Sequence, residues 1–283
     1  MSDFQDEVPP PPYVPPPSEA SPREIIVLPW AAPLRWLRQG GRDLAAHPGI
    51  SLFFGAAFWG MAQALGAVFR ARPEFTMTMA SGCLLLGPFL AMGLYDVSRR
   101  LEAGLQPGFV ASLTCWRSHL RSMGLLVGVL MVLELLWGRA SLVVIAVFFN
   151  TGMPSSVGVV QAVFNPGNLE FVLVYTLVGG VFAALVFAIS VVSIPMILDR
   201  DTDAITAAIS SLEVVVNNTG VMLLWGGLIV LLTAMALLLP WSLGLLLVGP
   251  LLGHASWHAY RGAVRWLAPA SASLSWVQSR PEE

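Results

Sequence analysis

Residues 241–258 read WSLGLLLVGPLLGHASWH, and residues 75–95 read FTMTMASGCLLLGPFLAMGLY. Each stretch holds a Gly-Pro step with a leucine two positions after the proline, and Gly249 of one copy lies 162 positions after Gly87 of the other. In both copies an arginine follows the glycine by twelve positions. Both stretches are about as long as the roughly 20 apolar residues that a helix needs to cross a bilayer. They predict a polytopic membrane protein built by internal repetition.

The composition supports a membrane protein and excludes several other classes. Apolar residues make up 56% of the 283 positions and charged residues only 11%, about half the roughly 25% that is typical of soluble domains. The net charge of −2 gives no basic field for binding nucleic acid. The two cysteines, Cys83 and Cys115, suggest neither a disulfide nor a metal cluster. The sequence predicts no cofactor.

Six segments are apolar and long enough to span a membrane as helices. They are residues 50–69, 75–95, 123–149, 169–198, 221–239 and 241–258. We therefore expect an all-α membrane protein with six transmembrane helices, forming an integral membrane domain at residues 30–266. Residues 1–29 are polar and rich in proline, which predicts a disordered tail. Residues 267–283 form a second, short tail.

The arginines predict the orientation in the membrane. If the N-terminus is inside, twelve of the fifteen arginines fall on the cytoplasmic side, while Arg70 and Arg72 fall on the other and Arg139 lies within a span. Because cytoplasmic loops carry the excess of basic residues, both termini are expected in the cytoplasm.

A stripe of apolar residues at helical spacing precedes each odd-numbered span. The stripes are Trp30, Leu34, Leu37, Gly41 and Leu44; Phe109, Leu113, Trp116 and Leu120; and Ile205, Ile209, Leu212 and Val216. Each stripe predicts an interfacial amphipathic helix. The chain then reads as three tandem units, each an interfacial helix followed by a helical hairpin. Parallel repeats of this kind occur in transporters and equally suit a scaffold that transports nothing.

Glu134 and Arg139 are charged residues well inside the third predicted span, residues 123–149. Glu134 lies about 17 Å along the helix from the start of its span, at 1.5 Å per residue, and so near the middle of the membrane. An intramembrane carboxylate is a candidate for a proton or ion relay. It is equally consistent with a buried group that fixes the register of the helix bundle.

His254 and His258 are four positions apart, so they share one face of the last helix. This spacing suits two ligands of a metal or of haem iron. No acidic or thiol cluster joins them, and their aromatic neighbours Trp257 and Tyr260 also suit a structural place in an interfacial aromatic belt. No complete metal site is predicted.

A charged cluster follows the fourth span at its cytoplasmic end. It consists of Asp199, Arg200, Asp201 and Asp203. Acidic residues at this point can cap the next helix and are favoured by its dipole. A cation site is the alternative.

Three motifs carry a resemblance to a known family. They are SVVSIPM at residues 190–196 followed by Asp199-Arg200, the Gly-Pro segment at residues 87–102, and GHASWHAYR at residues 253–261. With these motifs the chain resembles a bacterial family of predicted integral membrane proteins of unknown function, over about residues 34–266. The resemblance implies a bacterial inner-membrane location and brings no catalytic residues.

No constellation typical of an enzyme is present, since the sequence lacks a nucleophile elbow, a phosphate-binding loop and a dinucleotide fingerprint. We expect a non-enzymatic protein that is transporter-like or membrane-organising. The alternative is a haem- or metal-handling accessory protein of a respiratory complex. The expected partners are the lipid bilayer and either a second copy or another membrane protein. Transport predicts that Glu134, Arg139, Gln63 and the charged cluster converge, whereas a scaffold predicts that they pair locally.

Overall fold

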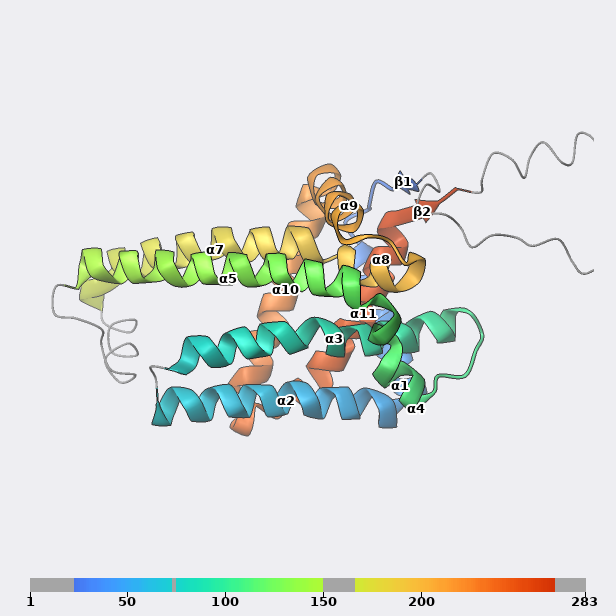
Figure 1. Ribbon diagram of the computed structural model, residues 1–283, viewed down its shortest axis with the longest axis horizontal. Coiled ribbons are helices and arrows are strands. Elements are labelled where there is room, and N and C mark those ends of the chain that lie inside the picture. Colours follow the sequence, from blue (N-terminus) through green and yellow to red (C-terminus); the bar gives the residue numbers. More distant parts are fainter. Residues whose placement is uncertain (1–22, 73–74, 150–165, 268–283) are drawn as a thin grey trace, which may run out of the picture.

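The computed structural model describes residues 23–72, 75–149 and 166–267 and is a bundle of helices (Figure 1). The helices are α1 Ala32–Ala46, α2 Pro48–Ala71, α3 Thr76–Glu102, α4 Phe109–Thr114, α5 Leu120–Phe148, α7 Leu169–Ser190, α8 Ser193–Arg200, α9 Ala204–Asn217, α10 Thr219–Leu238 and α11 Leu245–Ala263. Short 3₁₀ helices lie at η2 Cys115–His119, η3 Pro166–Asn168 and η4 Pro240–Ser242. Figure 1 shows α2, α3, α5 and α7 side by side along the longest axis, with α10 and α11 crossing them.

Five helical segments of the described residues are long and apolar enough to cross a membrane. They are Pro48–Ala71, Thr78–Glu102, Phe109–Phe148, Leu169–Arg200 and Thr219–Leu238. These segments coincide with the first five predicted spans, so the all-α membrane fold is confirmed. The sixth predicted span, residues 241–258, lies mostly in α11, a helix of 19 residues that is not among the five. A sixth span and the three tandem units stay predictions.

The folded part of the chain begins earlier than residue 30. Strand β1, Arg23–Ile25, pairs antiparallel with β2, Val264–Trp266. The backbone nitrogen of Leu28 then donates to Oδ1 of Asn218 at 2.7 Å. Because their backbone groups are paired, residues 23–29 belong to the fold rather than to the predicted tail at 1–29. Residues 1–22 and 268–283, where the two tails were predicted, lie outside the described residues.

The amphipathic helix α9 turns its apolar stripe outward, whereas α1 exposes only part of its stripe, because Leu37 packs against the core. The exposed stripe residues are Leu34 in α1 and Ile205, Ile209, Leu212 and Val216 in α9. The buried face of α1 carries Trp36 beside Gly40, and that of α9 carries the small residues Ala207, Ser210 and Ser211. An outward apolar stripe is the arrangement of a helix in contact with lipid, and small inward residues permit close helix packing. The stripe at 109–120 differs, because α4 passes through the 3₁₀ helix η2 directly into α5.

The fourth predicted span, residues 169–198, is interrupted. Helix α7 ends at Ser190 and α8 starts at Ser193. The ring of Pro195 would collide with the carbonyl of Val191 in a continuous helix, and it supplies no N–H. Because α7 has ended, the backbone nitrogen of Val192 has no helical acceptor and donates to the hydroxyl of Ser211 at 3.1 Å. The break lets the short helix α8 lie buried at the end of the bundle.

A tight loop joins α10 to α11. Trp241 and Ser242 both have positive φ angles, of 57° and 53°, a left-handed conformation that is unfavourable for residues other than glycine. The carbonyl oxygen of Trp241 accepts hydrogen bonds from Trp59 Nε1 at 2.8 Å and from Gln63 Nε2 at 2.7 Å. Two side chains of α2 therefore hold the loop in this conformation.

Helix α11 approaches its neighbours so closely that they contact it through glycine. A Cβ atom built on Gly40 of α1 would lie 2.7 Å from the backbone nitrogen of Ala255. A Cβ atom on Gly55 of α2 would collide with the carbonyl of Leu246. Both obstacles are backbone atoms, which cannot rotate away, so these glycines set the distance between the helices.

We predict that Gly55→Ala lowers the thermal stability of the protein in detergent, because α2 and α11 must move apart. Overpacking of this kind costs about 1–3 kcal/mol. The matched control is Gly60→Ala on the same helix, where a new Cβ atom would meet nothing within 4 Å. Alanine at such an open helical position is neutral or stabilising. Equal melting temperatures for the two variants would contradict the proposed contact.

Candidate functional site

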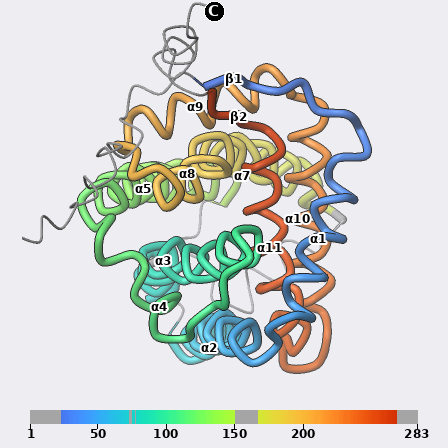
Figure 2. The backbone as a smooth tube through the Cα atoms, turned by 90° about the vertical axis from the view of Figure 1, so that its right-hand side faces the viewer, coloured from blue at the N-terminus to red at the C-terminus, as the bar shows by residue number. Residues whose placement is uncertain are grey.

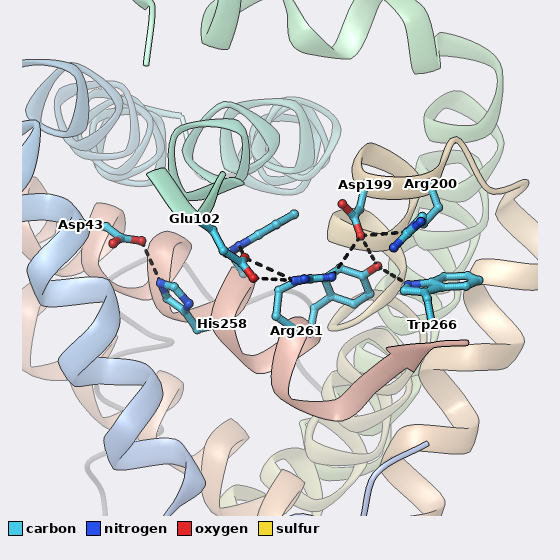
Figure 3. A network of polar contacts seen from close by, with 9 residues as sticks. Asp43, Glu102, Asp199, Arg200, His258, Arg261 and Trp266 are labelled. Atoms are coloured by element: carbon cyan, nitrogen blue, oxygen red, sulfur yellow. Dashed lines mark hydrogen bonds and ion pairs between the residues drawn. The ribbon is translucent and has the colours of Figure 1, made fainter. Parts of the chain in front are cut away.

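Polar side chains from α1, α3, α8, α11 and β2 meet at the end of the bundle that faces the viewer in Figure 2. We call it the arginine-rich end, because Arg99, Arg200 and Arg261 lie there. Figure 3 shows its central network, in which side chains from separate elements point toward one another. The contacts join α1, α3 and α8 to α11, and α11 to β2.

Asp199 is the acceptor at the centre of one half of this network. The hydroxyl of Tyr260 donates to Asp199 Oδ2 at 2.7 Å, and Tyr260 is fully buried. Trp266 Nε1 donates to the Tyr260 hydroxyl at 2.9 Å. Arg200 and Arg261 place nitrogens 3.3 and 3.6 Å from the same carboxylate oxygen, and the Arg200 guanidinium lies 5.1 Å from the Trp266 ring centroid. These contacts bind α8, α11 and β2 together.

Glu102, the last residue of α3, is the acceptor of the other half. Arg261 Nε lies 3.0 Å from Glu102 Oε1, and Trp257 Nε1 donates to Oε2 at 2.9 Å. Because Arg261 also faces Asp199, it links the two acidic residues. The result is a layer of paired charges across α3, α8 and α11.

The two candidate histidines share a helix face but have different partners. His258 Nε2 lies 2.8 Å from Asp43 Oδ2 of α1. Burial raises the pKa of Asp43, but hydrogen bonds with His258 and Ser98 lower it more, so the pKa lies below its ordinary value of 3.8.

His254 is fully buried, and hydroxyl groups occupy both of its ring nitrogens. Ser51 Oγ lies 3.0 Å from Nε2 and Ser98 Oγ lies 2.8 Å from Nδ1. A metal ion could bind His254 only by displacing one of these serines. The arrangement is that of a satisfied core histidine that connects α2, α3 and α11.

Asp96 is a functional-site candidate that the sequence reasoning missed. Its carboxylate is fully buried and accepts from Arg99 Nη2 at 2.6 Å, Arg100 Nε at 2.8 Å and Ser112 Oγ at 3.0 Å. The predicted span stopped at residue 95, whereas α3 continues to Glu102. An acid followed by arginines at i+3 and i+4 is a helical pairing pattern and was the signal available in the sequence.

Glu134 and Arg139 are not brought together. Glu134 Oε2 accepts a hydrogen bond from Ser81 Oγ of α3 at 2.7 Å. Arg139 is exposed, and within the described residues no ion pair joins it to Glu134. The carboxylate thus pairs locally with a neighbouring helix.

The charged cluster after the fourth predicted span divides among three roles. Asp203 caps α9, as predicted, by accepting from the backbone nitrogens of Ile205 and Thr206. Asp201 ends α8 in a left-handed conformation and lies 2.8 Å from His119 Nδ1. Asp199 and Arg200 belong to the network described above. In the parts of the chain that the structure describes, no three His, Cys, Asp or Glu side chains gather where they could hold a metal ion.

Comparison with known proteins places the chain among membrane proteins. The model of the family described as "Predicted integral membrane protein (DUF2189)" matches residues 75–199. The match confirms the resemblance to a family of predicted integral membrane proteins of unknown function. The SVVSIPM motif lies within the matched residues, and GHASWHAYR lies beyond them. No curated protein and no solved structure matches the chain.

Removing the hydroxyl of Tyr260 tests the network. We predict that Tyr260→Phe lowers the free energy of unfolding by about 1–3 kcal/mol, because it leaves the Trp266 N–H without an acceptor and removes the hydroxyl that donates to Asp199. Tyr175→Phe is the control, since the Tyr175 hydroxyl makes no hydrogen bond within the described residues. Thermal melts in detergent measure both variants, and equal melting temperatures would show that the network contributes nothing.

The Asp43–His258 contact predicts a pH dependence. A carboxyl with a lowered folded pKa contributes stability above its unfolded pKa, near 3.8, and loses that contribution as the pH falls through the folded value. The wild type is therefore expected to melt at a higher temperature than Asp43→Asn at pH 7. This gap should narrow when the melts are repeated at pH 3, and a gap that is constant with pH would contradict the role of the ionised carboxylate.

Proposed function

We propose that the protein is a non-enzymatic, membrane-organising protein of the bacterial inner membrane. In this proposal it has six spans, both termini lie in the cytoplasm, and the arginine-rich end faces the cytoplasm. The twelve-to-two distribution of arginines supports the orientation. The bundle then acts as a rigid anchor that presents a fixed polar layer to partners.

The separation of its polar groups is the observation that carries the proposal. Glu134 pairs with Ser81 between α5 and α3. Gln63 donates to the carbonyl of Trp241 in the loop between α10 and α11. The cluster at Asp199 lies with α11 and β2 at the arginine-rich end. A proton or ion path needs such groups in one chain of short contacts, and here each has its own local partner.

The rigidity of the arginine-rich end also supports the proposal. Asp199, Glu102 and Arg261 bridge three helices, and β2 adds Trp266. Paired charges of this kind restrict how the helix ends move relative to one another. A fixed arrangement suits a docking face better than a gate, which must open and close. His254, enclosed by two serines, gives no support to haem or metal handling.

Ion flux in reconstituted vesicles tests the proposal. Vesicles containing the wild type are expected to pass protons, Na⁺ and K⁺ no faster than protein-free vesicles, and Glu134→Gln should change nothing, because Glu134 serves packing. A wild-type flux that Glu134→Gln abolishes would refute the scaffold in favour of a transporter.

Cross-linking in native membranes tests directly whether the protein binds specific partners. An organising protein is expected to give a few discrete cross-linked species, identical for the wild type and Glu134→Gln. Cross-links that simply follow the abundance of membrane proteins would contradict an organising role.

A further inference from the structure

A cavity of about 430 Å³ opens beside the paired network, between α1, α11 and the segment that follows β1. Its polar lining consists of Arg35, Gln39, Glu102, His258 and Arg261. The apolar remainder includes Trp36 and Leu28. The volume lies within the range of small-molecule sites.

The polar groups of the cavity leave an excess of hydrogen-bond donors. Glu102 is occupied by Arg261 and Trp257, and His258 by Asp43. Arg35 has no ion-pair partner, and Gln39 no side-chain hydrogen bond, among the residues that the structure describes. Arg261 is shared by Glu102 and Asp199, so Arg35 is the arginine of the lining whose guanidinium meets no carboxylate of the described residues. A planar guanidinium with free N–H groups matches the oxygens of a phosphate.

The surroundings of the cavity indicate where such a phosphate comes from. Leu34, next to Arg35 in sequence, is 65% exposed, and Trp30, just before α1, is 68% exposed. Exposed apolar side chains with basic residues beside them are typical of contact with the headgroup region of a membrane. A lipid bound here would place its phosphate at Arg35 and its acyl chains along Leu34 and Trp30.

We propose that this cavity binds a phosphate ester anion, namely the headgroup phosphate of an anionic phospholipid. Arg35 is the principal ligand, and Gln39 on the next turn of α1 supplies an amide donor. The site goes beyond the proposed function, since it binds lipid whether or not the bundle conducts ions.

Lipid binding to the full-length protein in detergent tests this site by native mass spectrometry. The probes are phosphatidylglycerol and phosphatidylcholine with the same acyl chains. We expect phosphatidylglycerol to be retained in preference, and Arg35→Gln to weaken its binding about tenfold, the worth of one hydrogen-bonded charge. Arg35→Lys keeps the positive charge and should therefore retain part of the phosphatidylglycerol binding. Arg38→Gln is the matched control, because Arg38 is exposed on the same helix and does not line the cavity.

Equal binding by all variants, or equal weakening by Arg35→Gln and Arg38→Gln, would overturn the site. Glycerol phosphate and inorganic phosphate are added as competitors. If either compound displaces the lipid when both are present at equal concentration, the site binds a soluble phosphate, and the lipid assignment is overturned. Arg35 is exposed, so Arg35→Gln should keep the wild-type melting temperature. A loss of lipid binding with unchanged ion flux would separate this proposal from the proposed function.

Discussion

The close contact of α11 with three neighbouring helices, made through glycines, is the constraint on which the structure depends. Gly40 and Gly55 remove the side chains that would keep α1 and α2 away, and Gly253 of α11 does the same toward Leu94 of α3. Between helices in a lipid environment, packing and polar contacts replace the hydrophobic driving force. Because α11 lies this close, the residues on its last turns reach acceptors on α1, α3 and α8. The polar layer is thus a consequence of the glycines.

Local pairing explains how a chain with so few charges keeps some of them inside. A buried carboxylate is costly unless it is paired and hydrogen-bonded. Asp96 meets this condition with two arginines and a serine, and Asp199 meets it with Tyr260 and two arginines. Each acidic group is neutralised where it stands, which leaves Arg35 as an unmatched cation at the edge of the layer. The unpaired guanidinium of Arg35 distinguishes the proposed lipid site from the paired charges around it.

The sequence predicts the number and position of the first five spans because composition and length decide them. It also predicts the helices at α1 and α9, but not which face turns inward. The apolar stripe of α9 was visible, whereas burial of Ser210 and Ser211 depends on neighbours that no local pattern specifies. The break before α8 follows from Pro195 and could have been expected.

The partners of the site residues could not have been predicted from the sequence. Ser51 lies 203 positions from His254, and Asp43 lies 215 positions from His258. Such pairs are fixed by the packing of helices and leave no trace in the local spacing. The GHASWHAYR motif marked the correct helix, but the two histidines turned out to have separate partners. Asp96 was overlooked because the hydropathy of α3 falls before the helix itself ends.

The left-handed loop between α10 and α11 bears on how the protein is assembled. Its conformation at Trp241 and Ser242 is unfavourable on its own, and the two donors that hold it, Trp59 and Gln63, belong to α2. Synthesis proceeds from the N-terminus, so α2 is already made when the last hairpin emerges. The first hairpin then serves as the template on which the last one closes, and the chain order supplies the template before it is needed.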